Sequence, residues 1–218
     1  MLATLLVGTT GCLGAGMTLQ RVPVLAAGET EFAVGVGATA LGGADAEGGP
    51  SVTGVVPALE LSIRQGLGAH LDLGGRLYTL PLAGRIDLKW QWHESLEWDA
   101  SVAPGFTVGV PAVLTSGPLP GFLPAHRSPG LDPIVLHLPL LFGLWVEQHQ
   151  IVLAAKGNLV LTQAAEGLQA YPLLGGAVGF EVNLLPHGRL TPELSVVCGP
   201  AQQACAGTLG VTFHGGFL

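Results

Sequence analysis

Polar and apolar residues alternate with a period of two along most of this chain. In the stretch Arg85-Ile86-Asp87-Leu88-Lys89-Trp90-Gln91-Trp92, charged or amide side chains occupy one parity and apolar side chains the other. A period of two predicts a β-strand with one polar and one apolar face. In 134–147 apolar residues occupy both parities, so the pattern does not assign its faces there. The predicted strands are 29–40, 55–64, 70–78, 85–92, 96–108, 134–147, 151–161, 171–184, 189–197 and 208–217.

The connections between these strands alternate in length. Gly, Pro and His-rich turns at 65–68, 93–95, 148–149 and 186–188 follow every second strand. The other connections are mostly longer, at 41–53, 109–133, 163–169 and 199–206, with 79–82 as the short exception. Short turns at one end, longer loops at the other and an even strand number are typical of outer-membrane barrels.

The composition favours the same architecture. Only 11% of the 218 residues are charged and 49% are hydrophobic, whereas a typical soluble domain has about 25% charged residues. Yet no apolar run reaches the roughly 18 residues of a membrane-spanning helix, which the sequence therefore excludes. A transmembrane β-barrel reconciles both facts, since its apolar residues are dispersed. The net charge of −7 and the absence of a basic patch exclude nucleic acid as a partner.

From about Glu29 to Leu218, the chain resembles a small bacterial outer-membrane β-barrel protein. Its closing strand, Gly207-Thr-Leu-Gly-Val-Thr-Phe-His-Gly-Gly-Phe-Leu218, is similar to the C-terminal strand that the barrel-assembly machinery reads, with Phe217 penultimate rather than last. The resemblance implies location in the bacterial outer membrane, with membrane lipid and the assembly machinery as partners. We expect an all-β fold, a single antiparallel up-and-down transmembrane barrel of about ten strands, with eight as the alternative.

The sequence predicts a leader at the N-terminus. The apolar stretch Met1–Cys12 ends in small residues before a cysteine and resembles a bacterial lipoprotein signal, which would put lipid on Cys12. A plain signal peptide cut after a small residue such as Ala27 is the alternative, and a buried first strand is a third. We assign 1–27 to a leader and tether and 28–218 to the barrel. Residues 13–27 would form a tether or plug that enters the barrel.

In a membrane barrel the polar faces line the interior, where charges of both signs pair. The expected interior charge network is Glu60, Arg64, His70, Asp72, Arg76, Arg85, Asp87, Lys89, Glu97, Asp99, Lys156, Glu181, Arg189 and Glu193. Trp90, Trp92 and Trp98 lie beside a short turn, where tryptophan at the membrane interface is expected. A soluble core cluster is the alternative for these three.

Other candidate chemistry is sparse. Cys198 and Cys205 bracket a turn-rich segment and predict a disulfide rather than a metal site. The histidines are too dispersed for a metal, and nothing indicates a cofactor. His70 with Asp72 could orient a catalytic base, but a space-filling ion pair or hydrogen bond is the simpler interpretation, and the same holds for His214. We assign no catalytic residue.

Three functions remain open. The first is a non-enzymatic integral outer-membrane barrel, structural or with a narrow pore. The second is a barrel enzyme that acts on lipid or peptide. The third is a soluble lipocalin-like binder of a lipophilic ligand, with its apolar faces turned inward.

Overall fold

The computed structural model describes residues 20–44, 50–79, 82–109, 134–164, 167–185, 188–199 and 204–217. In these ranges all regular structure is β-strand, and no helix there could cross a membrane. The strands are β1 (Thr30–Ala44), β2 (Pro50–Gly68), β3 (Leu71–Thr79), β4 (Leu82–Glu94), β5 (Trp98–Val102), β6 (Gly105–Gly109), β7 (Ile134–Val146), β8 (His149–Ala164), β9 (Gly167–Leu185), β10 (Gly188–Gly199) and β11 (Ala204–Phe217).

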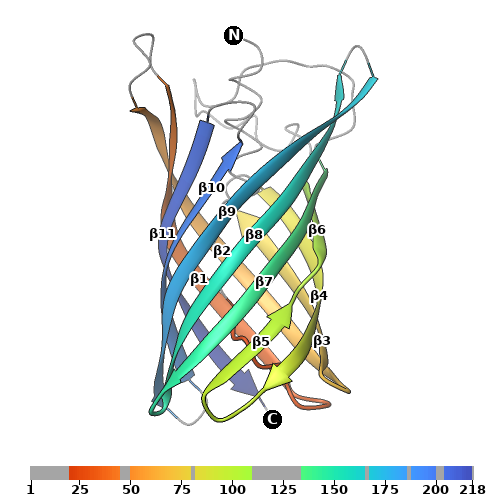
Figure 1. Ribbon diagram of the computed structural model, residues 1–218, viewed down its shortest axis with the longest axis vertical. Helices are drawn as coiled ribbons and strands as arrows, with labels where there is room; N and C mark the ends of the chain where they lie inside the picture. Colours follow the sequence, from red (N-terminus) through yellow and green to blue (C-terminus); the bar gives the residue numbers. More distant parts are fainter. Residues whose placement is uncertain are drawn as a thin grey trace.

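These strands form one closed antiparallel barrel (Figure 1). Apart from β5 and β6, each strand pairs with its neighbours in the chain, and β11 pairs with β1 to close the ring. Both β5 and β6 lie between β4 and β7, so together they occupy one position, and the barrel has ten strands. The prediction of an all-β up-and-down barrel of about ten strands is confirmed, and the alternative of eight strands is wrong.

The break between β5 and β6 has a local cause. The sequence pattern predicts one strand over 96–108, but Pro104 has no N–H to donate to a ladder. Ala103 and Pro104 leave the regular pairing: the amide of Leu88 donates to the carbonyl of Pro104 at 3.0 Å, and the amide of Ala103 donates to the carbonyl of Pro139 at 3.2 Å. The wall therefore remains hydrogen-bonded across the kink.

The two ends of the barrel differ. We call one the turn end, because tight turns at Ala69–His70, 95–97 and 147–148 lie there together with the C-terminus (Figure 1). The opposite end is the loop end. The predicted turns at 65–68 and 93–95 are misplaced, because β2 continues to Gly68 and β4 to Glu94. Most strands are longer at the loop end than the pattern indicated.

The outer surface of the wall is apolar. Along β1 and β2 the exposed side chains include Phe32, Val34, Leu59, Leu61 and Ile63, and the other strands follow the same rule. The charged residues of the same strands point inward and are buried. The soluble binder with inward apolar faces is therefore wrong, because the structure has the opposite arrangement.

The predicted disulfide is present. Cys198 and Cys205 are cross-strand partners in the β10–β11 pair, with Cα atoms 4.0 Å apart and a bond between their sulfurs. The bond closes the β10–β11 hairpin at the loop end. Cys12 lies outside the described residues, as does the predicted turn at 186–188 except for Gly188.

Candidate functional site: the barrel interior

The interior is built by alternation along the strands, and β4 shows it best. Arg85, Asp87, Lys89 and Gln91 are buried inside the barrel, while the residues between them face outward and are exposed. The outward residues include Trp90 and Trp92, each about half exposed, at 50% and 48%. The charges of this strand therefore line the lumen, and its tryptophans lie on the outer surface towards the turn end.

Near the loop end the interior is apolar. A cluster of buried side chains from six strands lies there, with Tyr171 packed against it. Its members are Tyr78, Ala83, Val135, Val160, Leu173 and Val197. We call this cluster the apolar layer, and close packing of this kind leaves few voids as large as a water molecule.

Below this layer lies a network of arginines and carboxylates from β2, β3 and β4. Arg64 is paired with both Asp72 and Asp87. Arg76 donates to Glu60 at 2.9 Å and lies 3.8 Å from Asp87. The Nε of Arg85 lies 3.4 Å from Asp87. Buried charges are tolerated only when they are paired and hydrogen-bonded, and here each charge faces one of the opposite sign.

Strand register and one glycine explain how this network forms. Arg64 on β2, Gly74 on β3 and Asp87 on β4 lie at the same level of the barrel. A Cβ at Gly74 would collide with the guanidinium of Arg64 and lie 3.1 Å from Asp87. The missing side chain on β3 therefore lets Arg64 reach across a whole strand to Asp87.

The neighbouring strands β6, β7 and β8 carry a second polar group. His137 on β7 connects Thr107 on β6 with Asn158 on β8, at 2.6 Å and 2.7 Å. Because Asn158 Oδ1 is an acceptor, Nδ1 of His137 donates to it, and Nε2 accepts from the Thr107 hydroxyl. Lys156, one inward position away, lies 3.7 Å from Glu193 on β10.

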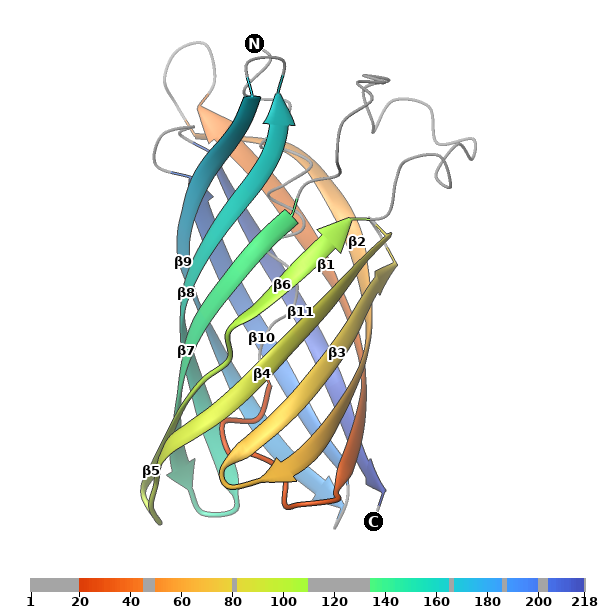
Figure 2. The same ribbon diagram turned by 90° about the vertical axis from the view of Figure 1, so that its right-hand side faces the viewer.

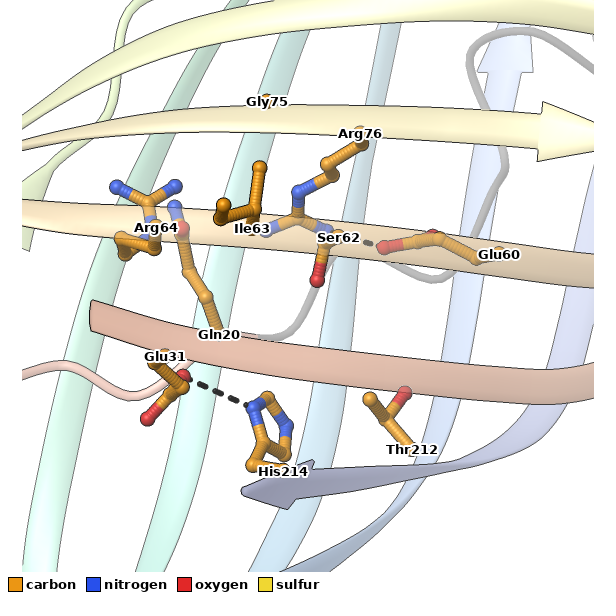
Figure 3. A pocket seen from close by; sticks show the side chains of 10 residues that line it. All are labelled: Gln20, Glu31, Glu60, Ser62, Ile63, Arg64, Gly75, Arg76, Thr212 and His214. Atoms are coloured by element: carbon orange, nitrogen blue, oxygen red, sulfur yellow. Dashed lines mark hydrogen bonds and ion pairs between the residues drawn. The ribbon is translucent and has the colours of Figure 1, made fainter. Parts of the chain in front are cut away.

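A third group lies towards the turn end, on β1, β9, β10 and β11. Glu31 is paired with Arg189 and accepts from Nδ1 of His214 at 3.1 Å. The Nε of Arg189 lies 3.5 Å from Glu181. Figure 3 shows Glu31 and His214 pointing toward one another beside a small cavity that Gln20, Glu60 and Arg76 also line.

This cavity is small. Its volume of about 10 Å³ is roughly what one water molecule requires. No organic ligand fits it. Among the described residues no group of three or more histidine, cysteine or carboxylate side chains could hold a metal ion.

Two expected members of the charge network are not in it. His70 has φ 59° in the turn after β2, and its side chain is 62% exposed, 4.0 Å from the exposed Glu94. Glu97 lies in the exposed turn before β5. Both expectations are wrong because the alternation was extended past the strand ends, where it no longer fixes direction. The suggested pairing of His70 with Asp72 is also wrong, because His70 is exposed and Asp72 is buried.

The other twelve expected members have inward side chains, and Arg189 is the least buried of them. Asp99 accepts from the Trp145 indole at 2.6 Å and from Gln150 at 3.0 Å. The sequence pattern did not single out His137, because its strand is apolar on both parities. Glu31 was also missed, although its inward parity was visible from the Phe32 and Val34 alternation.

Comparisons with known proteins give the fold. No protein-family model and no curated protein sequence matches this chain. An outer-membrane channel from Pseudomonas putida F1 superposes with a TM-score of 0.59 at 10% sequence identity, covering 92% of this chain and 100% of that one. The chain therefore has the fold of a bacterial outer-membrane barrel.

More distant superpositions also cover most of the chain. The outer-membrane protease OmpT from Escherichia coli gives a TM-score of 0.43 at 10% identity, covering 92% of this chain and 98% of that one. The attachment invasion locus protein Ail from Yersinia pestis gives 0.39 at 10% identity, covering 88% and 99%.

Proposed function

We propose that this chain is an integral protein of the bacterial outer membrane whose barrel is closed, with a structural role rather than that of an open pore. One observation carries the proposal: the described interior is packed in successive layers. The apolar layer around Val135 and Val160 is followed by the ion pairs of Arg64, Arg76 and Asp87. Side chains packed in this way support a narrow lumen without a continuous water path.

The outer surface supports the membrane location. In the described wall the outward side chains between the rims are apolar, whereas the barrel's buried charges point inward. Turning the wall inside out would place arginines against lipid, at a cost of about 2–4 kcal/mol each near the midplane. Lipid is therefore the expected partner of this surface, and the closing strand β11 is the segment expected to bind the barrel-assembly machinery.

Conductance tests the closed state. The full chain, extracted from outer membranes and reconstituted into planar bilayers, should give no current steps above the background of empty detergent. Insertion is checked on the same sample by heat-modifiable migration in gels, with a general porin as the conducting control. Reproducible steps of uniform size from the inserted barrel would mean that the interior is an open pore.

A second candidate is a barrel hydrolase, favoured by the hydrogen-bonded order Thr107, His137 and Asn158. An activated nucleophile has this arrangement: a hydroxyl, an imidazole that accepts the hydroxyl proton, and a third group that orients the imidazole. Against this candidate, Thr107 is fully buried beneath the apolar layer. Hydrolysis of a fluorogenic acyl ester by the native barrel, lost on His137→Ala, would establish it, and absence of turnover by the folded protein would exclude it for that substrate class.

A further inference from the structure

The segment from Gln20 to Glu29, just before β1, lies within the turn-end part of the barrel rather than beside it (Figure 2). Val22 is fully buried, and Gln20 and Leu25 are each 5% exposed. Two backbone hydrogen bonds join the segment to the wall where it enters. The amide of Gly28 donates to the carbonyl of Gly66 at 3.0 Å, and the amide of Gly66 donates to the carbonyl of Glu29 at 2.9 Å.

Lys89 binds the backbone of this segment. Its ammonium donates to the carbonyl oxygens of Arg21 at 3.0 Å and Pro23 at 2.8 Å, and to the carboxylate of Asp72 at 3.0 Å. An ammonium has three N–H donors, so these three acceptors match its full capacity. Lys89 is completely buried, and two of the three acceptors that make this burial tolerable belong to the segment.

The next residues of the segment are bound in the same way. The amide of Val24 donates to the side-chain oxygen of Gln91 at 2.9 Å, and the amide of Leu25 donates to Asp72 at 3.3 Å. Lys89, Gln91 and Asp72 thus contact two carbonyls and two amides within the five residues from Arg21 to Leu25. The wall therefore binds this segment through its peptide backbone, as proteins often do when they bind peptides.

Two features of the wall fit the segment's shape. Val22 packs in a cluster with the inward side chains of Ala103, Leu141, Val152 and Ala154. On β2, a Cβ at Gly66 would collide with the carbonyl of Ala26. Glycine at this position lets the segment cross the strand at close range.

We propose that Lys89, Asp72 and Gln91 form a peptide-binding site inside the barrel, and that its ligand is the chain's own segment Gln20–Ala27, which the mature protein keeps. The segment then closes the turn end of the lumen as a built-in plug. Processing must occur before Gln20, as at Cys12. Cleavage after Ala27 would remove the ligand and leave Lys89 with Asp72 as its remaining acceptor among those described. The plug's role rests on the proposed closed barrel, but the binding site is tested separately from conductance.

The first test is the mass of the mature protein. The full chain is produced with its own leader in a Gram-negative host and purified from outer membranes. Intact-mass spectrometry should give a chain that begins at or before Gln20. A mature chain that begins at Gly28 would overturn the proposal, whatever the barrel conducts.

The second test is thiol labelling at Val22. A Val22→Cys barrel, treated in its folded state with a water-soluble maleimide, should be labelled slowly at that position, with the labelled residue identified by peptide mass spectrometry. An Ala26→Cys barrel, altered at the exposed mouth, should be labelled rapidly. Equal rates at the two positions would contradict the proposal.

The role of the site follows from a second substitution in the Val22→Cys background. Lys89→Met should increase the labelling rate by about tenfold or more, because the segment loses both hydrogen bonds from the charged ammonium. Lys156→Met is the matched control, since this buried lysine faces Glu193, and it should leave the rate unchanged. If the Lys89 variant does not fold by heat-modifiable migration, Gln91→Leu replaces it, and an unchanged rate in that folded variant would overturn the site.

Discussion

Removing a single negative charge from the interior network should strongly destabilise the barrel. Asp87 is the carboxylate shared by Arg64, Arg76 and Arg85. In Asp87→Asn the side chain keeps its shape and loses its charge, so three buried guanidinium groups face one carboxylate fewer. Arg64 keeps Asp72 and Arg76 keeps Glu60, but the one carboxylate found against Arg85 among the described residues is lost.

The size of the effect follows from the burial of these groups. Removing one partner of a buried ion pair costs about 3–5 kcal/mol. The amide oxygen of asparagine still accepts a hydrogen bond, so we expect the lower part of this range, about 3 kcal/mol of unfolding free energy. The assay is reversible urea unfolding of the barrel in detergent or lipid, followed by tryptophan fluorescence, with heat-modifiable migration as a check of folding.

The matched control lies on the same strand. Glu94 is exposed at the turn end, 4.0 Å from His70, so Glu94→Gln should change the unfolding free energy by no more than about 0.5 kcal/mol. If Asp87→Asn changes stability as little as this control, the carboxylate does not hold the arginines, and the packed interior is refuted.

Two further predictions concern the outer surface and the loop end. Val36 is exposed at the middle of β1, and Val36→Arg should lower the stability of the barrel in lipid by about 2–4 kcal/mol. Val52→Arg, near the loop end, should lower it by at most about 1 kcal/mol. Equal stability of the two variants would mean that Val36 does not face lipid at the midplane. Reducing the Cys198–Cys205 disulfide, which links residues seven apart, should lower the stability by about 2 kcal/mol. The shift of the heat-modification midpoint with reductant measures it, and no shift would contradict a structural role.

The faces of the strands could be predicted wherever charge marked one parity. On β4 and β10, arginine, lysine and carboxylates alternate with leucine, valine or tryptophan, and the inward direction follows from where charge is tolerated. The same rule gives no answer on β7, where Val135 and Leu141 point inward and Leu136 and Leu138 outward. That ambiguity hid His137 and the apolar layer at the loop end.

The contacts within the site could not be predicted, because they depend on strand register. The alternation places Arg64, Asp72 and Asp87 on inward faces, but it does not give their heights relative to one another. Only the pairing of Arg64 with Gly74 and of Gly74 with Asp87 brings the arginine and the aspartate together. Similarly, the leader pattern indicated a tether or plug, while its binding by Lys89 and Gln91 required the structure.

The apolar face of the wall contacts lipid, while the charged face is enclosed. The most direct measurement is cysteine labelling on β4 in intact outer membranes. Ile86→Cys and Leu88→Cys, both outward and exposed, should resist a water-soluble maleimide and react with a lipid-soluble one, and they should become reactive to the water-soluble reagent after unfolding. Rapid labelling of these positions by the water-soluble reagent in the folded barrel would contradict the account.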